Sequence, residues 1–250
     1  MNKLMVRLTT LCTALMFMLP FATELSAQGV ERTWSQAKIH VPAALTRDGR
    51  ACNGVVGTGT CQSRIKPGRF PVLVFLHGSA PTQTGAFFHN LGTVVVYPDS
   101  YARPGRFSGE QAFREEKVPF VNMRTEEAAY AASQLGGQPW ADTSKLILAG
   151  HSEGGIATAV YSSGGYKARI IMSWVCGGQG WQTLSGIRGG GPILALAGGA
   201  DPIFNRLGQG RGCASHVGWG NQHIVVPNAG HHLWNQPIAK QAVAQFVQAQ

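Results

Sequence analysis

A glycine-flanked segment around Ser152 carries residue types suited to nucleophilic catalysis. Residues 146–155 have the sequence LILAGHSEGG, which contains the pentapeptide GHSEG and so matches the pattern Gly-x-Ser-x-Gly. An apolar run precedes the serine and small residues follow it, as in a sharp turn from a buried strand into a helix. Glycines two residues before and after the serine indicate close backbone contacts that a Cβ atom would block. We therefore expect Ser152 to project from the turn as a nucleophile.

An acid and a histidine follow Ser152 in the order that this chemistry needs. Asp201 comes just after the apolar run 192–198, and His231 follows the run 223–227. A serine hydroxyl has too high a pKa to attack a carbonyl unaided, so a histidine must take its proton while a carboxylate fixes the imidazole tautomer. The chain order Ser, Asp, His, with each residue after a strand, is that of α/β-hydrolases. The sequence therefore predicts a catalytic triad of Ser152, Asp201 and His231.

Other residues compete for two of these roles. Asp99 also follows an apolar run, but it precedes the serine, whereas Asp201 would also suit a plain turn before a proline. His232 is adjacent to His231, and we expect only one of them to reach Ser152. His231 directly follows a glycine beyond the last apolar run, where α/β-hydrolases place their base, so His232 is expected to pack beside it.

The segment after residue 76 is expected to bind the oxyanion of a tetrahedral intermediate. It continues an apolar run with His77, Gly78 and Ser79. In α/β-hydrolases one oxyanion donor is the backbone N–H after the nucleophile, here Glu153, and another comes from a loop early in the fold. We expect the backbone N–H groups of Ser79 and Glu153 to form this site. The alternative is that the segment simply ends a strand.

The elements that would position these residues follow from the pattern of apolar runs. Short runs rich in β-branched residues alternate with helix-like stretches, which is typical of an α/β fold with a mostly parallel central sheet flanked by helices. Strands are predicted at residues 70–77, 93–97, 146–149, 170–175, 193–197 and 223–226. Helices are predicted at residues 123–135, 153–161 and 237–247. Residues 33–43 are predicted as an antiparallel edge strand, and residues 45–68 as a Gly-rich loop.

Residues 1–27 are predicted to be a secretory signal peptide. Lys3 and Arg7 precede the mostly apolar run 11–22, and small residues ending at Ala27 offer a cleavage site. The run is short for a membrane span and no charged cluster follows it, which disfavours the alternative of an uncleaved anchor. We expect an exported protein, periplasmic or secreted, without stable membrane insertion after cleavage. Residues 28–250 are expected to form a single α/β-hydrolase domain.

The cysteines that remain after removal of residues 1–27, which contain Cys12, predict two disulfides. They are Cys52, Cys61, Cys176 and Cys213, an even count in a chain that is expected to be exported. Several connectivities are possible, and the local pairing of Cys52 with Cys61 would leave Cys176 to pair with Cys213. Metal ligation is the alternative, but the sequence has no C-x-x-C pair and no histidine pair at ligand spacing, so no metal site is predicted.

Composition and charge bear on the partners. The net charge is +9, from 21 Lys and Arg against 12 Asp and Glu, which favours anionic surfaces in general. The basic residues are scattered, with no basic run or base-stacking motif, so nucleic-acid binding is not predicted. The sequence has no Gly-rich phosphate loop, so no cofactor is predicted. The oligomeric state stays open.

Further motifs give the chain a family resemblance. They are His77-Gly78, the segment YPDSYAR at residues 97–103, Arg124 within an Ala-rich stretch, the GHSEG turn, Gly199-Ala200-Asp201 and Gly230-His231. Together they resemble the dienelactone hydrolase group of α/β-hydrolases over roughly residues 70–250. The resemblance implies hydrolysis of a small-molecule ester or lactone through an acyl-enzyme. Dienelactone hydrolases proper use a cysteine nucleophile, whereas this chain has Ser152, which favours a general serine esterase.

Three tryptophans could shape a substrate pocket. Trp181, Trp219 and Trp234 fall in loops after strands, the side of the sheet where pockets form in such folds. They could line an apolar acyl site or stack on a sugar, and packing within the loops is an equal alternative.

Two other functions stay open: a peptidase or acyl-aminoacyl hydrolase with the same triad, and a non-catalytic relative that binds a ligand. An intact triad counts against the last.

Overall fold

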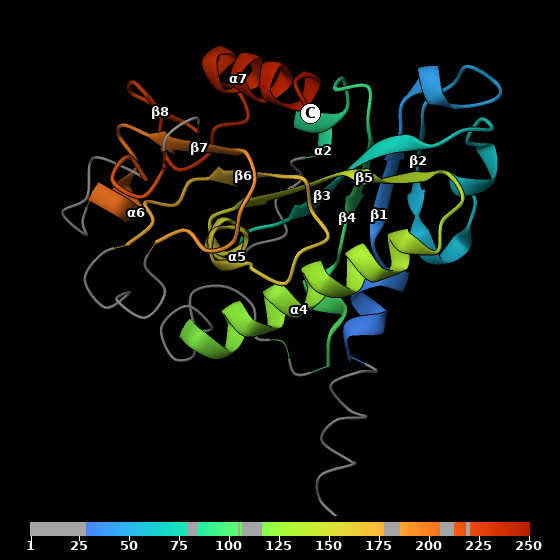
Figure 1. Ribbon diagram of the computed structural model, residues 1–250, viewed down its shortest axis with the longest axis horizontal. Helices are drawn as coiled ribbons and strands as arrows, with labels where there is room; N and C mark the ends of the chain where they lie inside the picture. Colours follow the sequence, from blue (N-terminus) through green and yellow to red (C-terminus); the bar gives the residue numbers. More distant parts are fainter. Residues whose placement is uncertain are drawn as a thin grey trace, which may run out of the picture.

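One eight-stranded sheet organises the part of the chain that the structure describes. The computed structural model describes residues 29–79, 85–104, 106, 117–177, 186–205, 213–218 and 221–250. The strand order in the sheet is β2-β1-β4-β3-β5-β6-β7-β8 (Figure 1). The predicted signal peptide lies outside the described residues.

Most of the sheet is parallel, as predicted. Its strands are β1 Lys38–Val41, β2 Cys52–Val55, β3 Phe70–Leu76, β4 Val94–Tyr97, β5 Ala141–His151, β6 Ala168–Met172, β7 Ile193–Gly198 and β8 Gln222–Val226. Neighbours from β4 to β8 run parallel, whereas β1 pairs antiparallel with both β2 and β4. The carboxyl ends of the parallel strands therefore meet at one edge of the sheet, where functional residues gather in such folds.

Helices cover both faces of the sheet. They are α2 Gly85–Phe88, α4 Lys117–Gly136, α5 Glu153–Val160, α6 Pro202–Asn205 and α7 Pro237–Gln248. Figure 1 shows α7 above the sheet and α4 and α5 below it. Alternate residues of β3 explain this arrangement: Val72 and Val74 share a core cluster with Leu135 of α4, while Phe75 shares another with Phe246 of α7. A strand buried on both faces needs such a continuous apolar run.

The antiparallel end of the sheet differs from the prediction. Residues 29–35 are helical, so the strand predicted at 33–43 is reduced to β1. Val30 and Trp34, four residues apart, are both buried on this helix, a spacing that suits one helical face. The edge of the sheet is formed by β2, which lies in the segment predicted as a loop. The strand predicted at 170–175 also ends early, because Ser173 has a φ of 53° that interrupts extended backbone.

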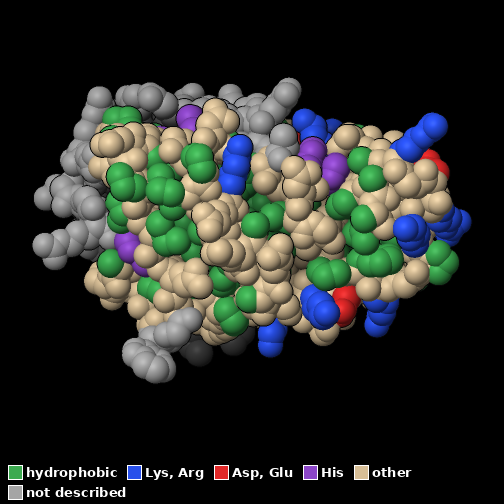
Figure 2. All heavy atoms as spheres, turned by 90° about the horizontal axis from the view of Figure 1, so that it is seen from above, with side chains coloured by type: hydrophobic (Ala, Val, Ile, Leu, Met, Phe, Trp, Pro, Cys, Tyr) green, Lys and Arg blue, Asp and Glu red, His purple; other side chains and the backbone are tan. Residues whose placement is uncertain are grey.

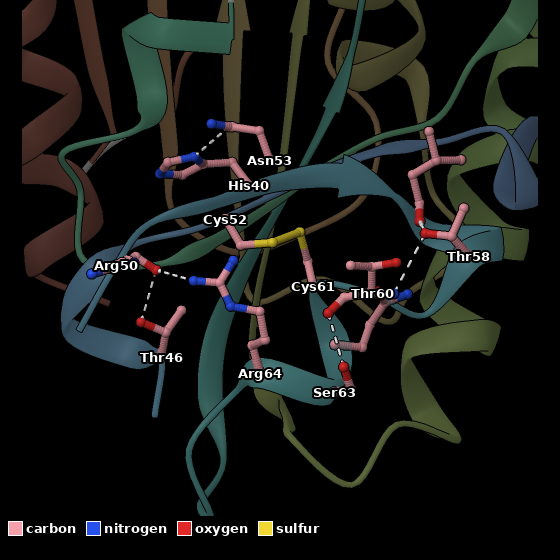
Figure 3. Close-up of a disulfide and its surroundings, with 12 residues drawn as sticks. His40, Thr46, Arg50, Cys52, Asn53, Thr58, Thr60, Cys61, Ser63 and Arg64 are labelled. Carbon is pink, nitrogen blue, oxygen red and sulfur yellow. Dashed lines mark hydrogen bonds between the residues drawn. A yellow bond between two sulfur atoms is a disulfide. The ribbon is translucent and has the colours of Figure 1, made fainter. Parts of the chain in front are cut away.

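The two disulfides join the cysteines as predicted. Cys52 of β2 is bonded to Cys61, and Cys176 is bonded to Cys213. The Cys52–Cys61 bridge ties the edge strand to the segment that follows it, and both cysteines belong to the buried core (Figure 3). Paired cysteines fit an oxidising environment. Among the described residues, none of the helices is both long and apolar enough to cross a membrane.

On one face of the molecule (Figure 2), basic side chains lie mainly at the antiparallel end of the sheet. In the face seen in Figure 2, Lys and Arg side chains are spaced apart and lie mainly toward the end where β1 and β2 lie. The described basic residues of this part of the chain are Arg32, Lys38, Arg47, Arg50, Arg64, Lys66 and Arg69. One of them is neutralised locally, because Arg64 pairs with Asp48 at 2.8 Å.

Candidate active site

Ser152 occupies a strained turn between β5 and α5. Its backbone has φ 55° and ψ −115°, a conformation that non-glycine residues rarely adopt, and the residue is only 7% exposed. The flanking glycines are required by close contacts: a Cβ atom on Gly150 would lie 2.1 Å from the carbonyl oxygen of Gly154, and one on Gly154 would lie 2.1 Å from that of Leu76. The turn thus packs too tightly against α5 at Gly150, and against β3 at Gly154, for any side chain at these positions.

Asp201 and His231 are joined by a hydrogen bond at the ends of β7 and β8. Nδ1 of His231 lies 2.7 Å from Oδ2 of Asp201. Because a carboxylate oxygen only accepts, Nδ1 carries the proton of this hydrogen bond. The other oxygen of Asp201 accepts the backbone N–H of Ile203 at 2.9 Å, and Asp201 is 1% exposed. The carboxylate is therefore held in place from two sides.

The backbone of His231 is held against the turn that carries Ser152. Its carbonyl oxygen accepts hydrogen bonds from Nε2 of His151 at 3.0 Å and from Oγ of Ser173 at 2.6 Å. The rings of His151 and His231 lie 4.8 Å apart. Since His151 immediately precedes Ser152 and Ser173 immediately follows β6, the ends of three strands converge on the loop of the predicted base.

His151 is an uncharged member of this group. Burial, and then the nearby His231, lower the pKa of His151 to about 3. Its proton lies on Nε2, which donates to the carbonyl, while Nδ1 has no hydrogen-bond partner among the described residues. His232 is exposed, with its ring 5.3 Å from that of His151, and partial burial lowers its pKa.

The loop after β3 lies against Ser152. A Cβ atom on Gly78 would be 3.4 Å from Cβ of Ser152. Nε2 of His77 accepts the backbone N–H of Ser100 at 3.2 Å, so Nδ1 carries the proton and donates to the carbonyl of Gly78 at 2.6 Å. Burial, and then the charge of Arg124, hold the pKa of His77 well below its ordinary value, which keeps the ring neutral.

Comparison with known proteins identifies the fold. No protein-family model and no curated protein sequence matches the chain. Among solved structures, an esterase from the archaeon Pyrobaculum calidifontis superposes with a TM-score of 0.53 at 15% identity, covering 90% of this chain and 88% of its own. A protein from Klebsiella pneumoniae assigned as a dienelactone hydrolase gives a TM-score of 0.55 at 17% identity, covering 73% of this chain and 89% of its own. The chain has the α/β-hydrolase fold.

A peptidase shares this fold. Dipeptidyl peptidase 4 from Porphyromonas gingivalis superposes with a TM-score of 0.54 at 16% identity. The match covers 85% of this chain, which spans only 35% of the peptidase. At these identities the similarity concerns the α/β-hydrolase fold and not the substrate.

Of the remaining predicted residues, Trp234 lies beside this framework. Trp234 is half-buried, with its ring 4.6 Å from that of His151 and 5.5 Å from that of Phe87. Trp181 and Trp219 lie outside the described residues. Asp99, the alternative candidate for the orienting acid, accepts the backbone N–H of Tyr101 at 3.0 Å, a local contact at the end of β4.

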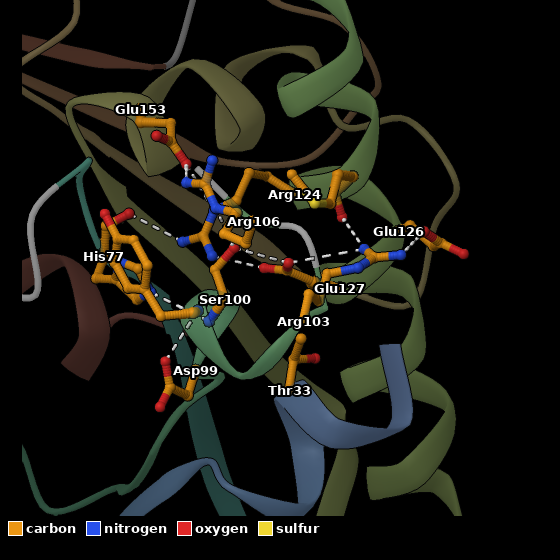
Figure 4. Close-up of polar contacts among 12 residues, drawn as sticks. Thr33, His77, Asp99, Ser100, Arg103, Arg106, Arg124, Glu126, Glu127 and Glu153 are labelled. Atoms are coloured by element: carbon orange, nitrogen blue, oxygen red, sulfur yellow. Dashed lines mark hydrogen bonds and ion pairs between the residues drawn. The ribbon is translucent and has the colours of Figure 1, made fainter. Parts of the chain in front are cut away.

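A buried ionic cluster that was not predicted from the sequence lies behind the loop after β3. Figure 4 shows Arg106, Arg124, Glu127 and Glu153 converging from different elements of the α/β-hydrolase fold. An Arg and a Glu three residues apart in an Ala-rich helix are typical of a solvent-exposed pair, so nothing in the local pattern indicated burial. His151 and Ser173 were missed as partners of His231 for a similar reason, because their shared acceptor lies far away in the sequence.

Proposed function

We propose that the protein is a serine hydrolase that cleaves a carboxylic ester or lactone through an acyl-enzyme, with Ser152 as nucleophile, His231 as base and Asp201 as the orienting acid. The observation that carries the proposal is the hydrogen bond between Asp201 and His231. The loop that contains His231 is bonded through its carbonyl oxygen to His151, next to the strained backbone of Ser152. A purely structural role would not need a serine at φ 55° and a histidine paired with a buried aspartate at adjoining strand ends.

The protonation states support this division of roles. With the proton of His231 on Nδ1, its Nε2 accepts the proton of Ser152 as the hydroxyl oxygen attacks the substrate carbonyl. The imidazolium that forms is stabilised by the carboxylate of Asp201, and it then protonates the leaving alcohol. Water attacks the acyl-enzyme by the same route in reverse, which releases the acid and restores Ser152.

The negative charge of the tetrahedral intermediate needs two donors. Glu153 is the first residue of α5, so its N–H has no carbonyl partner within the helix and points toward developing negative charge. Ser79 lies in the loop that packs against Ser152 through Gly78. We propose the backbone N–H groups of Ser79 and Glu153 as the oxyanion hole.

Two substrate classes remain candidates. The resemblance to dienelactone hydrolases and the structural similarity to an esterase support an ester or lactone. The similarity to a dipeptidyl peptidase supports peptides as the second class. Comparing kcat/KM for p-nitrophenyl esters of short and long acids with that for peptide p-nitroanilides separates the two.

Labelling tests the nucleophile. We expect an aryl phosphonate to add once to the wild-type protein, with the adduct located on Ser152 by peptide mass spectrometry, and to abolish ester hydrolysis. The Ser152→Ala variant should neither react nor hydrolyse esters. An adduct on a different residue that abolishes activity would overturn the assignment.

The cysteines and the N-terminal segment bear on where the protein is located. Two disulfides fit an oxidising environment, and we propose that the chain is exported after cleavage near Ala27. N-terminal sequencing of the protein secreted or released from the periplasm tests this; an N-terminus at Met1 would contradict it.

A further inference from the structure

The ionic cluster behind the loop after β3 lies entirely inside the protein. The side chains of Arg124 and Glu127 are 0% exposed, and those of Arg106 and Glu153 are 1% exposed. Removing charges from water is costly, and apolar residues of similar size would often be as stable or more so. A buried cluster of this kind therefore invites a functional explanation.

Arg124 is the residue that connects the cluster to the loop and to the turn. Its Nη2 donates to the carbonyl oxygen of His77 at 2.9 Å, and its Nε lies 3.4 Å from Oε1 of Glu153. Its Nη1 is fixed by Glu127 of the same helix at 2.5 Å. One planar guanidinium group on α4 thus contacts both segments that hold the proposed oxyanion donors (Figure 4).

We propose that Arg124 is a positioning residue that orients both backbone donors of the oxyanion hole. The inference rests on the proposed function. It assigns to Arg124 no contact with the substrate; the residue acts through His77 on one side and through Glu153 on the other.

The first connection runs through two consecutive peptide units. Arg124 holds the carbonyl of His77, and the ring of His77 donates to the carbonyl of Gly78 at 2.6 Å. A peptide unit is planar, with its N–H directed opposite to its C=O. Holding the carbonyl of Gly78 therefore also aims the N–H of Ser79, the first proposed donor.

The hydroxyl of Tyr101 strengthens this connection. It donates to the carbonyl of Ser79, and its ring stacks on that of His77 with centroids 5.2 Å apart. The loop is thus fixed at three successive carbonyl groups, those of His77, Gly78 and Ser79. The contact at Gly78 restricts rotation of the peptide unit that carries the Ser79 N–H, and the other two contacts fix the peptide units on either side of it.

The second connection runs through the side chain of Glu153. Its backbone N–H is the other proposed donor, and its Oε1 pairs with both Arg106 and Arg124. Arg106 also donates to Oγ of Ser100 at 3.0 Å, which in turn donates to Glu127 at 2.9 Å. The first residue of α5 is therefore tied to α4 by its side chain as well as by packing.

The charges of the cluster also favour an oxyanion nearby. Glu153 places a carboxylate one residue from the nucleophile, where an unpaired negative charge would repel the tetrahedral intermediate. The guanidinium groups of Arg106 and Arg124 offset that charge. Donors that are held in place and a neutralised surrounding are what electrostatic stabilisation of a transition state requires.

The test compares Arg124→Lys with Arg103→Lys in the full-length mature protein. Lysine keeps the charge but cannot contact Glu127, Glu153 and the His77 carbonyl at once. Arg103 is a matched control, because it pairs with Glu126 at 2.6 Å and with Glu127 at 3.7 Å, yet its contacts are with α4 rather than with the loop or the turn. Active-site titration with an aryl phosphonate gives the concentration of folded sites, so kcat is expressed per site.

We expect kcat per site for a p-nitrophenyl ester to fall about 10- to 100-fold in Arg124→Lys while KM changes less than about threefold, which is somewhat less than the loss of one whole oxyanion donor. Affinity for an alkyl boronic acid, whose oxygen occupies the oxyanion hole, should fall with kcat/KM. Arg103→Lys should keep kcat within about twofold. If Arg124→Lys does not fold, Glu153→Gln takes its place, because it keeps the shape and the backbone N–H but removes the charge that the guanidinium groups hold.

The outcomes separate this inference from the proposed function. A wild-type protein that is neither active nor labelled at Ser152 overturns both. A wild type whose activity depends on Ser152, with kcat per site unchanged in Arg124→Lys or Glu153→Gln, overturns the inference alone. An equal loss in Arg103→Lys also overturns it, since the effect would then belong to the cluster's general packing.

Discussion

The Nε2–H group of His151 donates to the carbonyl oxygen of His231 at 3.0 Å, although the residues are 80 positions apart. The first of them precedes the proposed nucleophile and the second is the proposed base. Together with the hydroxyl of Ser173 on the same oxygen, this contact ties the loop after β8 to the turn after β5. Two side chains that do not react thus help to set the distance between the proposed nucleophile and the proposed base, through hydrogen bonds to one backbone carbonyl.

Ser173→Ala should weaken this connection without unfolding the protein. The variant removes one of two donors to the His231 carbonyl, so we expect kcat to fall about 3- to 10-fold with KM nearly unchanged, from a less well oriented base. Steady-state kinetics on a p-nitrophenyl ester measure this. Ser144→Ala is a suitable control, because that hydroxyl is exposed and donates only to Asp142, at 2.6 Å. Equal kcat in Ser173→Ala and the wild type would show that His151 alone suffices.

His151 should make stability depend on pH. Its pKa is about 3 in the folded protein against an ordinary 6.5, so the unfolded chain binds the proton first as the pH falls. The stabilisation is complete above pH 6.5 and is lost as the pH falls toward 3, by about 1.4 kcal/mol per pH unit within that window.

His151→Gln isolates that contribution, because the amide can still donate to the His231 carbonyl but does not titrate. Urea unfolding at several pH values between 4 and 6 should give a slope of unfolding free energy against pH that is smaller by about 1.4 kcal/mol per unit in the variant. Every other histidine is present in both proteins. Parallel slopes would mean that His151 takes up a proton in the folded state.

Asp201→Asn should abolish most activity while leaving the fold intact. Asparagine can still accept the N–H of Ile203, but it no longer stabilises the imidazolium and it permits the wrong tautomer of His231. We expect kcat to fall about 10³- to 10⁴-fold. Asp99→Asn, which changes the alternative candidate for the orienting acid, should keep kcat within about threefold of the wild type, because the contact of Asp99 with the Tyr101 N–H is local. A larger loss in Asp99→Asn than in Asp201→Asn would exchange the two roles.

The two disulfides should differ in their contribution to stability. Cys176 and Cys213 are separated by 37 positions and Cys52 and Cys61 by 9, so the Cys176–Cys213 bridge closes the larger loop. Loop-closure entropy gives about 4 kcal/mol for the Cys176–Cys213 bridge and about 3 kcal/mol for the Cys52–Cys61 bridge. Guanidinium unfolding of the paired Cys→Ser variants measures both losses. A greater loss for the Cys52–Cys61 pair would point to its packing in the core rather than to loop closure.

Local patterns were sufficient to predict the parallel part of the fold. The strands from β3 to β7 contain apolar runs buried on both faces, and the turn at Ser152 is marked by glycines that the close contacts of Gly150 and Gly154 require. The residues proposed for catalysis follow strands of this sheet, so their order along the chain was enough to predict a triad. These features depend on neighbours in the sequence or on a general rule of parallel sheets.

The features that were missed depend on distant partners. Edge strand β2 contains Asn53 and Gly54 and is stabilised by pairing with β1 and by a disulfide rather than by an apolar pattern. Arg124 is buried because Glu153 and the carbonyl of His77 lie beside it in the folded protein. A single sequence does not indicate such contacts, since an arginine on a helix is ordinarily solvated.

Pre-steady-state release of p-nitrophenol tests the central claim most directly. On mixing with a p-nitrophenyl ester, the wild-type protein should release about one equivalent per folded site in a burst, followed by slower steady turnover as the acyl-enzyme is hydrolysed. Both the burst and the turnover should vanish in Ser152→Ala. A burst of the same size in Ser152→Ala would show that another residue carries the acyl group, and Ser152 would then not be the nucleophile.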